Sequence, residues 1–120
     1  MEWIYVFVGG GLGSLCRYGV ARLAMRWEVN LPLGTILANV IACFLLGLLM
    51  GWMTRHPEQR ALQLLLAVGF CGGFSTFSTF SLENVQLWQN GAYTTAMLNV
   101  LLSVVLCFGS VLAGMKLLSS

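Results

Sequence analysis

Four long apolar stretches, separated by short polar connections, run along this chain. An α-helix needs about 20 apolar residues to cross a lipid bilayer, and each stretch is long enough. The connections contain proline, glycine, asparagine or charged residues, and none is large enough for an extramembrane domain. The pattern therefore predicts one all-α membrane domain over residues 1–120, with helices at 3–25, 33–53, 61–86 and 93–118.

The tryptophans support these boundaries. Amphipathic aromatic rings collect at the headgroup level of a membrane, where a spanning helix ends. Each tryptophan falls at a predicted helix end, and Tyr93 opens the last helix. The four tryptophans are Trp3, Trp27, Trp52 and Trp88.

Composition narrows the class of protein. Hydrophobic residues make up 58% of the chain and charged residues only 8%, whereas soluble domains carry about 25% charged residues. A soluble globular domain is therefore excluded, and membrane lipid is the expected surrounding. Six Lys and Arg against four Asp and Glu, a net charge of +2, leave no basic stripe for phosphates, which excludes nucleic acid as a partner.

The basic residues divide equally between the two predicted membrane faces. Arg55, Arg60 and Lys116 fall on the face of the amino terminus, and Arg17, Arg22 and Arg26 on the other. Because an excess of Lys and Arg sets orientation, equal counts predict that the chain inserts both ways round. Two oppositely inserted copies can pair as an antiparallel homodimer. The alternative interpretation is that six charges are too few to decide.

Small residues recur four positions apart on every predicted helix, a spacing that lets membrane helices pack closely. The pairs are Gly9/Gly13, Gly47/Gly51, Gly69/Gly73 and Ser110/Gly114. They predict tight association without specifying the partner.

Each apolar stretch contains one cysteine, and none of the four has CxxC spacing or a histidine neighbour. We therefore interpret them as small buried apolar residues, and as neither disulfides nor metal ligands. They are Cys16, Cys43, Cys71 and Cys107.

No set of residues for catalysis or proton coupling is visible. His56 lies in a connection beside Pro57, and Glu83 lies near the end of the third predicted helix. With no carboxylate or lysine at mid-depth, the chain lacks the usual residues of a proton-coupled pump. We therefore do not expect an enzyme.

Uncharged polarity is concentrated in the third stretch, in GFCGGFSTFSTFS at residues 69–81. Gly72 and Gly73 beside five hydroxyl residues make a poor helix, which predicts a break near residues 72–76. Such a break is tolerated in a membrane only where protein or a water-filled cavity surrounds it. The freed carbonyls of Gly72 and Ser75 would suit a hard cation, and two copies would supply four oxygens.

The same segment repeats every three residues, with phenylalanine at 74, 77 and 80 and hydroxyl residues between. The positive ring edges can line a path for an anion without a charge that traps it. A phenylalanine triplet is also typical of lipid-facing or packing positions. Asn39, Asn99 and Ser103 can donate hydrogen bonds from other helices. Arg17 can attract anions to an aqueous vestibule, or serve as an ordinary helix-end anchor.

Three segments resemble the signature segments of the Fluc fluoride channels, also called the CrcB family. They are GGGLGSLCRYG at 9–19, GTILANVIACFLLG at 34–47, and residues 69–81. The resemblance runs in order through three helices, with weaker support from Asn99 and Ser103. It implies an antiparallel, dual-topology homodimer in the bacterial cytoplasmic membrane. Such a dimer exports fluoride passively through two pores, reduces fluoride toxicity, and holds a structural sodium ion at its centre.

The resemblance also implies roles for individual residues. The fluoride pore would contain Phe77, Phe80, Asn39, Ser78, Thr79 and Ser103, with Arg17 near the vestibule. The sodium ion would be held by the backbone carbonyls of Gly72 and Ser75. Ser75 departs from the threonine often found there, but a main-chain ligand should tolerate the change.

Two other functions remain open at the level of sequence. A small multidrug-resistance type exporter shares the length, helix number and dual topology, but it needs a glutamate in the first helix, and residues 6–16 contain none. A noncatalytic subunit of a larger membrane assembly would carry out no transport when purified alone.

Overall fold

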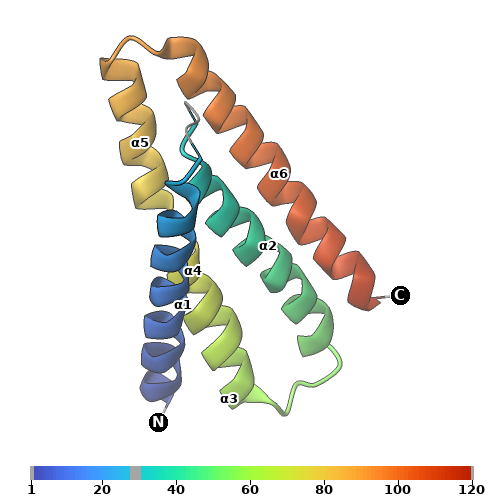
Figure 1. The fold of residues 1–120 in the computed structure, drawn as a ribbon. Helices are drawn as coiled ribbons and strands as arrows, with labels where there is room; N and C mark the ends of the chain where they lie inside the picture. The colour runs from blue at the N-terminus through green and yellow to red at the C-terminus, as the bar shows by residue number, and fades with distance from the viewer. Residues whose placement is uncertain (1, 28–30, 120) are drawn as a thin grey trace.

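The structure, a computed structural model, describes residues 2–27 and 31–119 and is all-helical over this part of the chain (Figure 1). Its elements are α1 (Glu2–Ala24), α2 (Leu33–Met53), α3 (Arg60–Gln63), the π-helix η1 (Leu64–Cys71), α4 (Gly72–Phe74), α5 (Phe77–Gln89) and α6 (Tyr93–Ser119). Elements α3 to α5 together form the third span. Within the described residues, four helical stretches are long and apolar enough to cross a membrane. The predicted all-α fold with four spans is confirmed.

The third span is longer than the sequence predicts, reaching Gln89 instead of residue 86. The helix stops where Gly91 takes a positive φ of 82°, a conformation that glycine adopts without strain. The Ala92 N–H then donates to the Leu87 carbonyl at 2.8 Å. Residues 28–30 of the first predicted connection lie outside the described residues.

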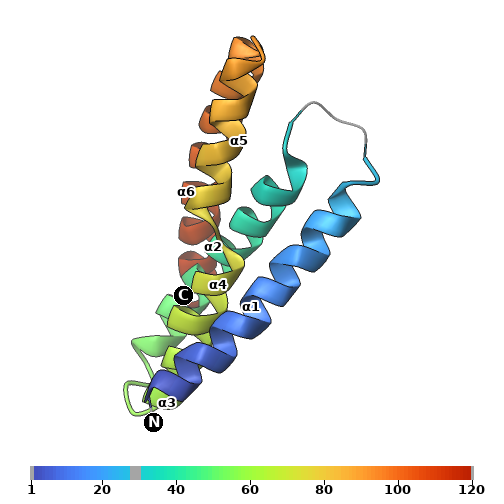
Figure 2. The same cartoon turned by 90° about the vertical axis from the view of Figure 1, so that its left-hand side faces the viewer.

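The spans pack as two pairs, α1 against η1 and α4, and α2 against α6 (Figures 1 and 2). Within each pair the two helices run in the same direction along the molecule (Figure 1). The buried core between the pairs is small and consists of Ala38, Ala42 and Phe74. Most large apolar side chains of the single chain face outward, as expected where lipid or a second copy is the surrounding.

Glycine allows both pairs to approach backbone to backbone. A methyl group at Gly13 would collide with the Phe70 carbonyl, and one at Gly47 would collide with the Val111 carbonyl. The small-residue faces of α1, α2 and the third span, and Gly114 of α6, are therefore confirmed as close contacts. Their partners, which the spacing did not specify, lie within the same chain.

The prediction that all four cysteines are buried is wrong for Cys16, which is exposed. The other helices of the single chain leave its thiol uncovered. Cys71 is buried, whereas Cys43 and Cys107 are half-buried.

We expect Gly13→Ala to destabilise the protein, because the added methyl meets the backbone of Phe70. Overpacking of this kind costs about 1–3 kcal/mol. Gly11→Ala is the matched control on the same helix, since its methyl meets nothing within 4 Å and should raise stability by up to about 1 kcal/mol. Reversible unfolding in mixed micelles measures both. Equal effects of the two substitutions would contradict the close packing of α1.

Candidate functional site

The helical backbone of the third span is interrupted at Ser75 and Thr76. Ser75 has φ −80° and ψ 155°, and Thr76 has φ −151° and ψ 122°, both extended. Of residues 72–76, near which the sequence predicts a break, only Ser75 and Thr76 are extended. Gly72 and Gly73 are helical, and the lack of a side chain at Gly73 allows close packing against the Gly10 carbonyl.

Asn39, in the middle of α2, holds the extended backbone at Thr76. Its Nδ2 donates to the Thr76 carbonyl at 3.2 Å, and its Oδ1 accepts from the Thr76 N–H at 2.8 Å. One side chain therefore replaces the helical partners that the break removes. A carboxamide has two N–H groups, so one donor of Asn39 is left for another acceptor.

The Thr76 side chain starts the next helix. Its hydroxyl accepts from the Thr79 N–H at 3.2 Å, which caps α5. The Ser78 hydroxyl lies 3.2 Å from the same oxygen. The hydroxyl residues that make the segment polar thus also determine where α5 begins.

The carbonyls of Gly72 and Ser75 both lack their helical partners. The Thr76 N–H, which would reach Gly72, is bound by Asn39, and the Thr79 N–H is bound by the Thr76 hydroxyl. Ser75 directs its own N–H and hydroxyl to the Cys71 carbonyl, at 3.0 and 2.9 Å. Gly72 and Ser75 line one cavity of about 130 Å³. Carbonyl oxygens in such a setting are suitable ligands for a hard cation.

The phenylalanines of the repeat divide between two environments. Phe74 is buried in the core and makes an edge contact with Phe70. Phe77 and Phe80 lie together on α5, with ring centroids 5.6 Å apart, and Phe77 is 78% exposed in the single chain. Because the break redirects the chain between Phe74 and Phe77, the even three-residue spacing does not produce one continuous stripe.

Arg17 reaches the site from α1. It lines a cavity of about 260 Å³ together with Thr76 and Thr79, so the first and third signature segments meet there. The Arg17 Nε is buried and, among the described residues, has no hydrogen-bond partner. Thr35 of α2 lines the same cavity.

Ser103 and Asn99 are the buried polar residues of α6. Ser103 is 5% exposed, and its hydroxyl has no partner among the described residues. Asn99 is fully buried, and its Nδ2 donates to the Asn84 Oδ1 at 2.8 Å. The Asn84 Nδ2 in turn donates to the Phe80 carbonyl at 3.0 Å, so these amides connect α6 to the ring pair.

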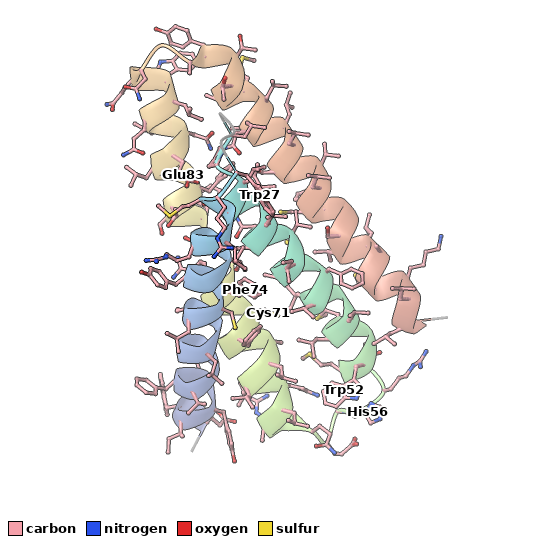
Figure 3. All side chains as sticks on the ribbon, viewed as in Figure 1. Trp27, Trp52, His56, Cys71, Phe74 and Glu83 are labelled. Atoms are coloured by element: carbon pink, nitrogen blue, oxygen red, sulfur yellow. The ribbon has the colours of Figure 1, made fainter. Side chains whose placement is uncertain are left out.

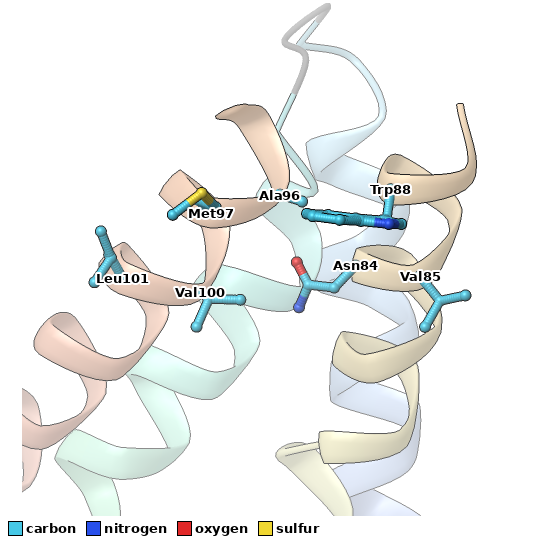
Figure 4. A pocket seen from close by; sticks show the side chains of 7 residues that line it. All are labelled: Asn84, Val85, Trp88, Ala96, Met97, Val100 and Leu101. Atoms are coloured by element: carbon cyan, nitrogen blue, oxygen red, sulfur yellow. The ribbon is translucent and has the colours of Figure 1, made fainter. Parts of the chain in front are cut away.

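Asn84 is a further polar residue of the site that the sequence motifs do not single out, although an asparagine inside an apolar stretch is costly unless it is paired. Its carboxamide lies in an otherwise apolar groove of about 430 Å³ between α5 and α6, beside Trp88 and Met97 (Figure 4). Glu83 also lies farther from a helix end than the sequence predicts. Glu83 lies on α5, which continues to Gln89 (Figure 3), and its Oε1 is buried without a hydrogen-bond partner among the described residues.

Comparison with known proteins identifies the family of this chain. Residues 4–115 match the family described as CrcB-like protein, Camphor Resistance (CrcB). A protein of Methylobacterium radiotolerans named fluoride-specific ion channel FluC is 45% identical over 92% of this chain and 80% of its own length. Proteins of the same name from Aeromonas salmonicida and Paracoccus denitrificans are 38% and 42% identical, over 98% and 94% of this chain and 96% and 90% of their own lengths.

We expect Asn39→Ala to destabilise the protein, because it leaves the Thr76 N–H and carbonyl without partners. Each unsatisfied buried group costs about 1–3 kcal/mol. Asn90→Ala is the control, since Asn90 is exposed at the end of α5. Unfolding in mixed micelles, with hydrogen exchange at the Thr76 amide, measures the effect. Unchanged exchange at Thr76 in Asn39→Ala would contradict this role.

Proposed function

Because the chain belongs to the CrcB-like protein family, we propose that it is a fluoride-selective channel through which fluoride leaves the cell passively across the bacterial cytoplasmic membrane. Four helices of membrane-spanning length and relatives named as fluoride-specific ion channels support this function. Such a channel lowers internal fluoride and its toxicity, and ion channels are not an enzyme class.

The observation that carries the proposal is the presence of uncharged donors on α2 and α6 together with the Phe77 and Phe80 ring pair on α5. Fluoride is small and strongly hydrated, so its path must replace water with hydrogen-bond donors and avoid a positive charge that would hold the ion. The remaining Asn39 N–H and the unpaired Ser103 hydroxyl meet this requirement. The ring edges add weak positive potential.

Helix register supports a common level for Asn39 and Ser103. Gly47 of α2 faces Val111 of the parallel helix α6. Asn39 precedes Gly47 by the same number of residues as Ser103 precedes Val111, about two helical turns. In parallel helices the two residues therefore lie at the same level. This common level supports the proposal that donors from two helices serve one anion path, which the hydroxyls of Ser78 and Thr79 would continue along α5.

Arg17 is proposed to attract fluoride into the vestibule. A cation beside a cavity raises the local concentration of anions. The cavity it lines reaches Thr76 and Thr79, so an attracted ion arrives next to neutral donors.

The structural sodium ion is proposed to bind to the carbonyls of Gly72 and Ser75. The residues present fit it, because both oxygens lack helical partners and a methyl at Gly72 would meet nothing within 4 Å. A sodium ion bound there would supply positive potential that offsets the cost of an anion in a low-dielectric pore. The chain's own contribution is the extended backbone that Asn39 holds in place.

The open side of Gly72 also supports the proposed antiparallel homodimer. One chain offers two carbonyls, and a second copy related by a twofold axis in the membrane plane would bring two more. The same pairing would cover the exposed Phe77 ring. Equal numbers of basic residues on the two faces allow the opposite insertions that the pairing needs.

We expect purified protein in liposomes to pass fluoride and not chloride. Phe77→Ala, Phe80→Ala and Asn39→Asp should each slow fluoride efflux by about tenfold or more, equivalent to about 1.4 kcal/mol on the barrier. Phe108→Ala, an exposed ring on α6 away from the break, is the control. A fluoride electrode measures efflux. Proton exchange driven by cationic drugs, with no fluoride flux, would instead identify a multidrug exporter, and no transport at all would favour an assembly subunit.

We expect reporters fused to the carboxyl terminus to appear on both sides of the membrane in comparable amounts, because neither face has an excess of Lys and Arg. Adding two lysines to the 54–59 connection should move most of the signal to one side. A single orientation in the unmodified protein would refute dual topology and leave the channel itself standing.

A further inference from the structure

Two cysteine thiols meet in the membrane interior at the packed face of α2 and α6. The parallel helices place Gly47 against Val111, where an added methyl would collide with the carbonyl. Cys43 precedes Gly47 by the same number of residues as Cys107 precedes Val111, about one helical turn, so the two cysteines lie at the same level of the parallel helices. The two thiols lie close to each other. The register of the packed helices agrees with this closeness.

A cavity of about 130 Å³ lies beside Cys43, one member of this thiol pair (Cys43 and Cys107). It is the cavity that Gly72 and Ser75 line, Cys71 lines it too, and none of its lining residues in the described part of the chain is charged. All three cysteines are free thiols. A ligand at this level therefore meets soft sulfur atoms and neither carboxylates nor imidazoles.

We propose that the thiol pair is a binding site for a thiophilic divalent cation with a filled d shell, such as mercury(II), which bridges Cys43 and Cys107. Soft thiolate sulfur selects such ions over hard cations. Each thiol loses its proton, two S–Hg bonds form, and two protons leave to water, with no change in oxidation state. The product carries no net charge, which avoids the cost of burying an ion.

The coordination is limited to two sulfurs. Among the residues described here, no group of three or more His, Cys, Asp or Glu side chains could hold a metal ion. One thiolate from each of the two helices gives a two-coordinate sulfur site.

Occupancy of the thiol pair blocks fluoride, an effect that rests on the proposed function. Cys43 lies one turn from Asn39, and Cys107 lies one turn from Ser103. A mercury bridge would hold α2 and α6 together next to Asn39 and Ser103. These two side chains could then no longer adjust their positions to a passing fluoride ion.

The binding test uses the full-length Cys16→Ser/Cys71→Ser protein, in which only the thiol pair remains. Titration with mercury(II) chloride should give one mercury per chain, loss of two titratable thiols per mercury, and S-to-Hg charge-transfer absorption. Adding Cys43→Ser or Cys107→Ser should weaken binding by about 100-fold or more, because the second sulfur no longer acts at high effective concentration. The corresponding alanine variants repeat the test if serine impairs folding. Two mercury ions per chain, or unchanged affinity in the single-thiol variants, would overturn the proposal.

The functional test measures fluoride efflux from liposomes with and without mercury(II). We expect efflux through the Cys16→Ser/Cys71→Ser protein to fall by about tenfold or more, and efflux through a variant without all four cysteines to stay unchanged. Bound mercury with undiminished efflux would overturn the inhibitory role. Absence of fluoride efflux before mercury is added would instead count against the proposed channel function, and the binding stoichiometry would still decide the thiol site.

Discussion

The pairing of Asn39 with the backbone of Thr76 is the interaction on which the candidate site depends. Hydrocarbon cannot satisfy an exposed peptide group, so an extended segment inside a membrane helix persists only if protein supplies both partners. Asn39 supplies them from α2, with bonds of 2.8 and 3.2 Å. Because Thr76 is held outside the helix, the carbonyls of Gly72 and Ser75 lose their amides and α5 starts anew at Phe77. The oxygen ligands proposed for sodium and the ring pair proposed for fluoride are thus two consequences of one constraint.

Close backbone packing keeps this arrangement in position. Lipid tails are as apolar as the helices, so the hydrophobic effect gives little preference for helix–helix contact, and short-range packing must provide it. The glycine contacts of α1 with the third span and of α2 with α6 provide that packing where the buried core is small. They also fix the register of α2 and α6, which places Asn39 opposite Ser103 and Cys43 opposite Cys107.

Two charged side chains, Arg17 and Glu83, lie near the candidate site. Arg17 borders the cavity at Thr76, and Glu83 has a buried carboxylate oxygen on α5. A path made of neutral donors can strip water from fluoride without holding it, and a nearby cation raises the concentration of anions at its entrance. Because neutral donors line the proposed path and a single nearby cation attracts the anion, a chain with only 8% charged residues suffices for a selective ion path.

The sequence by itself determined four spans, the polar segment at residues 69–81, the small-residue faces and the family, because apolar length and local motifs are readable without knowing any contact. Only the tertiary structure decided that the break lies at Ser75 and Thr76, since Gly73 packs against α1 and Asn39 binds the backbone of Thr76. Only the tertiary structure decided, too, that Asn84 pairs with Asn99 and that Glu83 lies inside the third span. These contacts depend on which side chains of neighbouring helices lie at the same level. Helix register determines that level, and the spacing of residues along a single helix does not.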